Sequence, residues 1–81
     1  MNAGIQMNDV VALLDDAPAR HFATGQPLLL RRGQIGTVMM TYDGTAFEVE
    51  FADRHGRAYA LLPVPAGKLI LLRESPVVAA A

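Results

Sequence analysis

Residues 46–51, Ala46-Phe47-Glu48-Val49-Glu50-Phe51, alternate between apolar and acidic side chains after the initial alanine. Successive side chains of a β-strand point to opposite faces of the sheet, so this alternation is typical of an antiparallel strand with one buried face. Just before it stands Asp43-Gly44, a dipeptide that favours the tight turn of a β-hairpin. The segment therefore predicts two antiparallel strands joined by a short turn.

Further short strands are expected on both sides of this hairpin. Residues 35–42 supply the strand that enters it. Residues 58–62 return after a second turn over 53–57, in which Gly56 can take a positive φ. A last strand is expected over residues 69–72, after Pro63-Val64-Pro65-Ala66-Gly67, a segment that breaks the preceding strand and could form one 3₁₀ turn.

The part of the chain before residue 34 carries weaker signals. Residues 9–14 are predicted as a buried strand because the run is short and β-branched, although one helical turn also fits a run of this length. Residues 17–33 contain two prolines and two glycines, which predict a long loop with a short strand near its end.

About five short strands with regularly spaced turns predict an all-β fold, a small SH3-like barrel of antiparallel strands. Closing or nearly closing the sheet would remove exposed strand edges. The expected organisation is a flexible N-terminal arm over residues 1–8, the barrel domain over residues 9–73 with its long loop at 17–33, and a tail over residues 74–81.

The chain has more apolar material than a domain of this size can bury. Of its 81 residues 52% are hydrophobic and 19% are charged, and the strands expected near residues 10–14, 58–62 and 69–72 are apolar on both faces. Either the loop and the two ends of the chain cover the outer faces, or these faces meet another protein. We favour the second interpretation, a non-enzymatic interaction module that self-associates or docks on a partner. The candidate anchors are Leu28, Leu29, Leu30, Ile70, Leu72, Val77 and Val78.

Composition also limits the compartment and the kinds of ligand. There are no cysteines, which excludes disulfides and thiolate metal sites. Residues 1–6 lack the basic and apolar regions of a signal peptide, and no apolar run has the length of a membrane span, so we expect a cytoplasmic protein. The net charge of −1 gives no general attraction to nucleic acid or anionic membranes.

Residues that could carry chemistry are scattered, and no catalytic, cofactor or metal site is expected. His21 and His55 lie in unrelated loops; Asp53 makes only a weak ligand pair with His55, and His21 has no close carboxylate beyond Asp15 and Asp16. Glu48 and Glu50 share a strand face, but a solvated sheet surface explains them better than a paired-carboxylate site. We therefore expect a protein that is not an enzyme.

A nucleic-acid-binding barrel is the alternative. Arg31-Arg32-Gly33 opens a basic, glycine-containing turn that resembles those of KOW-type motifs, which contact RNA. Arg54 and Arg57 form the other basic concentration in the chain. These four arginines are the candidate contacts to phosphate in this alternative.

Four blocks of the sequence, in this order, resemble a family of short bacterial proteins, the domain of unknown function 4926. The blocks are residues 9–16, 32–38, 47–51 and 56–62, and the resemblance extends over residues 8–73. It implies an SH3-like barrel similar in layout to the small barrel of nitrile hydratase β-subunits. The matching residues are turn glycines and core side chains, so no catalytic residue is carried over. The chain departs from the family in its longer stretch at 17–31.

Overall fold

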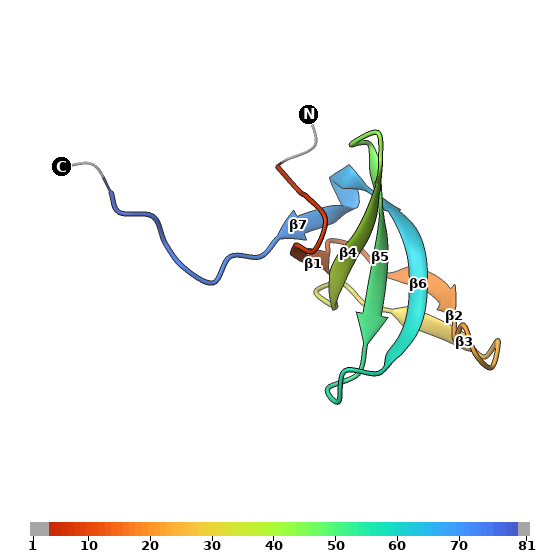
Figure 1. Cartoon of the computed structure of the whole chain (residues 1–81). Coiled ribbons are helices and arrows are strands. Elements are labelled where there is room, and N and C mark those ends of the chain that lie inside the picture. The colour runs from red at the N-terminus through yellow and green to blue at the C-terminus, as the bar shows by residue number, and fades with distance from the viewer. Residues whose placement is uncertain (1–3, 80–81) are drawn as a thin grey trace.

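A computed structural model describes residues 4–79, and within them the chain forms seven β-strands and one short 3₁₀ helix (Figure 1). Every strand pair is antiparallel. The predicted all-β fold is confirmed. In chain order the elements are β1 (Val10–Leu13), β2 (Ala17–Arg20), β3 (Pro27–Leu30), β4 (Ile35–Tyr42), β5 (Ala46–Ala52), β6 (Ala58–Pro65), the 3₁₀ helix η1 (Ala66–Lys68) and β7 (Leu69–Leu71).

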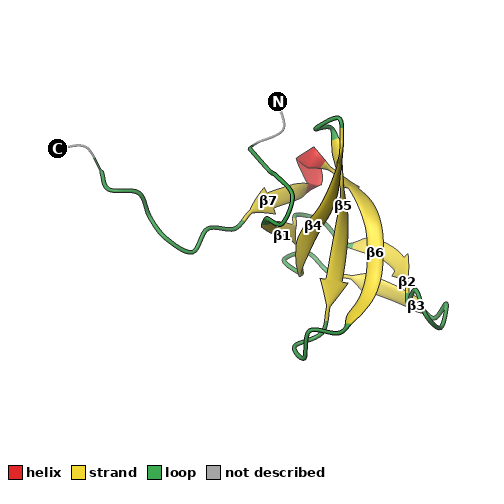
Figure 2. Cartoon of the chain, in the orientation of Figure 1, coloured by secondary structure: helices red, strands yellow, loops and turns green. Residues whose placement is uncertain are grey.

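Five strands form the main sheet, in the order β6-β5-β4-β1-β7, and β2 and β3 form a separate two-stranded sheet. The long strands bend along their length, and the β2–β3 hairpin lies beside β6 (Figure 2). Among the described strands β6 and β7 do not pair with each other, so the sheet has two edges. The expected barrel is therefore not closed, and the main sheet has the five strands that were predicted.

The core lies on the inner face of β5, as the alternation predicts. Phe47, Val49 and Phe51 have no exposed surface. Side chains from the other strands complete the core: Val11, Leu13, Leu30, Val38, Ala60, Val64 and Leu69. Both predicted turns are also confirmed, since Asp43 and Gly44 have φ values of 54° and 73°, and Gly56 has a φ of 81°.

The sequence predicted that Pro63 and Pro65 break the strand that begins at Ala58, and this prediction is wrong: β6 continues to Pro65 because both prolines occupy positions that need no N–H. The Ala66 N–H donates to the Thr45 carbonyl at 2.9 Å, which continues the β5–β6 register. Even-numbered residues of β6 therefore bond to β5, and Pro63 and Pro65 face away from it along the edge of the sheet. Proline is tolerated in edge strands at such positions.

The long loop expected over residues 17–33 is instead largely a hairpin, formed by β2 and β3. The His21 N–H donates to the Gln26 carbonyl at 2.9 Å, and this bond sets the register of β2 and β3. In that register Pro18 and Pro27 both stand at positions whose backbone faces away from the partner strand. Leu30, predicted as an interface anchor, is 1% exposed and belongs to the core.

The flexible arm expected over residues 1–8 is attached to the domain from Ile5 onward, while residues 1–3 lie outside the described part. Ile5 is 2% exposed and packs in the core. The Asn8 N–H donates to the Val38 carbonyl at 2.8 Å, and the Gln6 N–H donates to the Asp9 carboxylate at 2.8 Å. A single isoleucine in a polar stretch carries no periodicity, which is why the sequence pattern did not reveal this anchor.

Gly36 of β4 lies against β5 with no room for a side chain, and this contact gives a test of the packing. A Cβ at Gly36 would lie 2.5 Å from Val49 Cγ1 and 3.0 Å from the Glu50 carbonyl oxygen. Gly36→Ala is expected to lower the free energy of unfolding by about 1–3 kcal/mol, as overpacked cores do. Urea denaturation followed by circular dichroism measures this change. Gly67→Ala is the matched control, because a Cβ there meets nothing within 4 Å; equal effects at both positions would contradict the packing.

Candidate interaction surface

An apolar surface covers the outer face of the main sheet where β4, β1 and β7 lie side by side. Ala12 of β1 pairs with Ile35 on one side and with Ile70 on the other, so these three side chains form a row across the strands. Leu72 lies beside Val10, to whose carbonyl its N–H donates at 2.9 Å. We call the surface around Ala12 the outer strip; its exposed members are Val10, Leu14, Ile35, Ile70 and Leu72.

The outer strip is exposed because the inner face of the same strands already fills the core. Val11 and Leu13 of β1 point inward and are buried, so the alternation of the strand turns Val10 and Leu14 outward. The five exposed members keep between 37% and 57% of their surface accessible. Lys68 and Asp15 lie next to the strip, with Lys68 Nζ 3.2 Å from Asp15 Oδ2, and form part of a polar rim.

The structure brings together only two of the anchors predicted from the sequence. Ile70 and Leu72 belong to the outer strip, whereas Leu28 is half-buried against the core and Leu29 is 60% exposed on the separate β2–β3 hairpin. Val77 and Val78 lie in the extended segment that leaves the domain after β7, where they are 89% and 98% exposed. Figure 1 shows this segment running away from the sheets.

Sequence reasoning missed Val10, Leu14 and Ile35 as members of this surface. The two-sided apolar run at residues 10–14 was a signal for the first two. Ile35 stands at the start of a strand in which Gly36 and Val38 are buried, and only the register with β1 shows that it lies next to Ala12.

The outer face changes character toward β5, where Glu48 and Glu50 replace aliphatic side chains. The Tyr42 hydroxyl donates to Glu48 Oε1 at 2.9 Å. This hydrogen bond, together with slight desolvation and the nearby carboxylate charge, raises the pKa of Tyr42 above its usual value. Glu48 thus takes part in a surface hydrogen bond with Tyr42. The part of the outer face next to the outer strip is therefore polar.

Two basic turns lie toward one end of the sheet. The turn at residues 31–34 precedes β4 and the turn at residues 53–57 precedes β6, and the Gln34 side-chain amide donates to the Tyr59 hydroxyl between them. In residues 4–79 only Arg57 and Lys68 form ion pairs with carboxylates. The guanidinium groups of Arg31, Arg32 and Arg54 are therefore available to solvent. Phe22, which is 59% exposed, is linked to this end by its N–H, which donates to the Tyr59 carbonyl at 3.0 Å.

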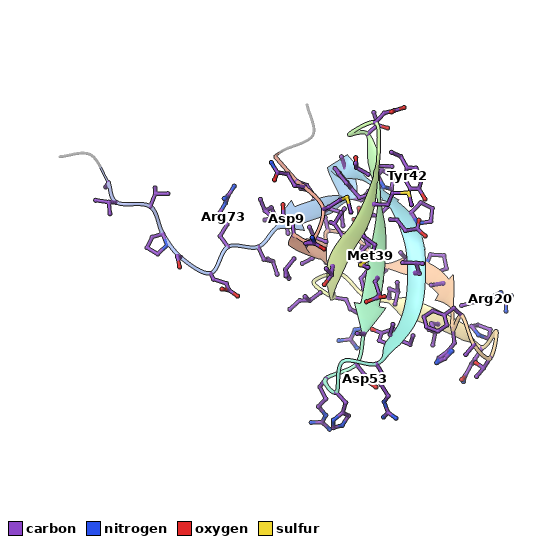
Figure 3. The ribbon with its side chains drawn as sticks, in the orientation of Figure 1. Asp9, Arg20, Met39, Tyr42, Asp53 and Arg73 are labelled. Carbon is purple, nitrogen blue, oxygen red and sulfur yellow. The ribbon has the colours of Figure 1, made fainter. Side chains whose placement is uncertain are left out.

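Asp53 organises the second basic turn. Its Oδ1 accepts the Arg57 N–H at 3.0 Å and the His55 N–H at 2.8 Å. The hydrogen bond from the Arg57 backbone lowers the pKa of Asp53; desolvation opposes it, and the hydrogen bond from His55 and the Arg57 charge add to the lowering. Figure 3 shows Asp53 and Tyr42 at opposite ends of the long strands.

No cluster of three or more His, Asp or Glu side chains suited to a metal ion occurs in residues 4–79. Over the same residues, no helix has the length and apolar character needed to cross a membrane.

A family model described as a domain of unknown function (DUF4926) matches residues 7–71. The chain belongs to the DUF4926 family. The match runs from just before β1 to the end of β7, so it includes every strand of the domain and most of the outer strip. No curated protein matches the chain, and no solved structure matches it.

The lowered pKa of Asp53 predicts an acid dependence of stability in this DUF4926 domain. A carboxyl group with a lower pKa in the folded state stabilises the fold above its unfolded pKa of about 3.9, and this stabilisation is lost as the pH falls through the folded value. Asp53→Asn should therefore lose less unfolding free energy than the wild type between about pH 5 and pH 2, as measured by urea denaturation. Asp43→Asn in the other turn is the control; a wild-type and Asp53→Asn pair with parallel pH profiles would contradict the assignment.

Proposed function

We propose that this DUF4926 domain is a non-enzymatic protein-interaction module, and that the outer strip is the surface through which it self-associates or docks on a partner protein. The observation that carries the proposal is the row Ile35-Ala12-Ile70, flanked by Val10, Leu14 and Leu72, on one open face of the sheet. Aliphatic side chains that gather on one surface with a polar rim are typical of protein interfaces.

The physical reason is the free energy of exposed aliphatic surface. Removing apolar surface from water is favourable by about 25 cal/mol per Å², and five partly exposed aliphatic side chains at one place offer this gain to a partner. The thin core of the domain has no second layer in which to bury them. We propose the cytoplasm as the compartment, since a chain without cysteine does not depend on an oxidising environment.

The first test is self-association measured by sedimentation velocity from about 10 μM to 1 mM, the range that weak interfaces require. The wild type is expected to associate, and Ile35→Lys and Ile70→Lys are expected to weaken association at least about tenfold, because each places a charge in the apolar contact. Leu61→Lys is the control, since Leu61 is 46% exposed on β6, away from the strip.

Equal association of all three variants would contradict the role of the outer strip. A wild type that stays monomeric at the highest concentration would remove self-association from the proposal. Docking on another protein would then be tested by comparing the wild type with Ile35→Lys in pull-downs from the native host.

Nucleic-acid binding is a second candidate, supported by the two basic turns at one end of the sheet. Arg31, Arg32 and Arg54 have no carboxylate partner within the described chain, and Phe22 offers an exposed ring for stacking on a base. This role would use a surface different from the outer strip, so the two candidates are independent.

Binding to a nonspecific single-stranded oligonucleotide across a salt series tests this second candidate. If it holds, the logarithm of the association constant falls with the logarithm of salt by about 0.7 for each phosphate contact, and Arg31→Ala/Arg32→Ala reduces the slope. Arg73→Ala is the control, because Arg73 follows Leu72, which bonds to Val10 at the start of β1, whereas Gly33 of the basic turn bonds to Leu13 at its end. No binding at low salt would exclude this candidate.

A further inference from the structure

The β7 edge of the main sheet carries backbone groups that form no hydrogen bond within residues 4–79. The Leu14 N–H donates to the Lys68 carbonyl and the Leu72 N–H donates to the Val10 carbonyl, both at 2.9 Å, so even-numbered residues of this segment bond to β1. Odd-numbered residues face the other way. The N–H and C=O of Leu71 and the C=O of Leu69 therefore point outward from the sheet, while the Leu69 N–H is used by the Ala66 carbonyl.

The opposite edge of the same sheet is protected. Pro63 and Pro65 have no N–H to offer along β6, and the Tyr59 carbonyl already accepts the Phe22 N–H. Prolines and covering segments are the means by which proteins prevent unwanted pairing at a strand edge. The β7 edge has neither: no proline occurs in β7, and the following segment leads away from it (Figure 1). The two edges thus differ in their capacity to add a strand.

We propose that a second copy of this chain pairs with the β7 edge, antiparallel and with Leu71 on the two-fold axis, to form one continuous ten-stranded sheet. This inference rests on the proposed function, because it specifies how the outer strip self-associates. A two-fold interface uses the same patch on both copies, so each group must meet its complement within the same short segment.

The backbone allows few registers for this pairing. The one proposed uses the N–H and C=O groups of odd-numbered residues, which do not bond to β1. With Leu71 on the axis, each Leu71 N–H donates to the carbonyl of the partner's Leu71. Each Arg73 N–H likewise donates to the carbonyl of the partner's Leu69. The Leu69 N–H cannot join this ladder, because it already donates to the Ala66 carbonyl. A shift that paired odd-numbered residues of one copy with even-numbered residues of the other would require groups that already bond to β1.

The side chains fit the same register. Ile70 stands opposite the partner's Leu72 on the outer face, so the two outer strips join across the axis. Lys68 stands opposite the partner's Glu74, which forms no ion pair within the described residues of its own chain. The chain bends at Glu74 and Ser75, and pairing ends there. The pair of Ile70 with Leu72 and the pair of Lys68 with Glu74 are therefore both complementary between the two copies.

Charge reversal tests the register directly. Glu74→Lys is expected to weaken dimerisation in sedimentation equilibrium by about two- to fivefold, the range of an exposed ion pair, and Glu74→Lys/Lys68→Glu is expected to restore it. Residues 68 and 74 are too far apart along an extended strand to meet within one chain, so restoration requires contact between copies. Lys68→Glu alone also removes the contact with Asp15, and Asp15→Asn is the control for that loss.

A second experiment uses the absence of cysteine from the chain. In the proposed register residues 70 and 72 of different copies form a non-hydrogen-bonded pair with Cα atoms about 4.5 Å apart, within the range of a disulfide. Ile70→Cys/Leu72→Cys should form a covalent dimer under mild oxidation, whereas Leu61→Cys should not. Arg73→Pro removes two interchain bonds and should weaken the dimer about tenfold, while Arg73→Ala, which keeps the N–H, should not.

The outcomes separate this inference from the proposed function. Restoration by the charge reversal, the disulfide and the effect of Arg73→Pro support the pairing. Association that depends on Ile35 and Ile70 but shows no disulfide, no charge restoration and no effect of Arg73→Pro overturns the pairing and leaves the outer strip as the interface. A chain that is monomeric at 1 mM, about the weakest affinity that the sedimentation series detects, overturns both the pairing and self-association.

Discussion

The inner face of β5 is the constraint on which the rest of the structure depends. Phe47, Val49 and Phe51 leave no exposed surface and fill the space between the curved sheet and the β2–β3 hairpin. A domain of 81 residues has room for one such layer. Because side chains alternate along each strand, every strand that lends a residue to this layer turns its other residues outward. The aliphatic outer residues of β1, β4 and β7 therefore stay on the surface.

Proline positions decide which parts of the sheet can still accept a partner. In β2, β3 and β6 the prolines stand where the backbone faces away from the paired strand, so they cost no hydrogen bond and remove donors from the edge. β7 has no such protection and adjoins the outer strip. Backbone pairing capacity and apolar surface thus coincide on one side of the domain, whereas the basic turns and Phe22 lie toward the beginning of β4 and β6.

Much of the fold could be predicted because its signals are local. The alternation at residues 46–51, the Asp43-Gly44 turn and the strand over residues 35–42 depend on neighbouring residues alone and were predicted correctly. Pairing decides the rest. Whether a proline breaks a strand depends on which side of the ladder it faces, so residues 17–33 and 63–65 were misjudged. Ile70 and Leu72 could be named as candidate anchors, but Ile35 could not, because its neighbours come from the register with β1.

Self-complementarity follows from the same two-residue period that fixes the core. If the symmetry axis passes through Leu71, residues equally distant from it along the strand meet in pairs, so Ile70 must suit Leu72 and Lys68 must suit Glu74. An aliphatic pair near the axis and opposite charges farther out meet this requirement within seven consecutive residues. The register that satisfies the side chains also uses the unpaired groups of Leu71 and Leu69. Since side-chain complementarity and backbone parity are separate properties of the segment, their agreement at one register is the strongest argument that this edge is built to meet its own copy.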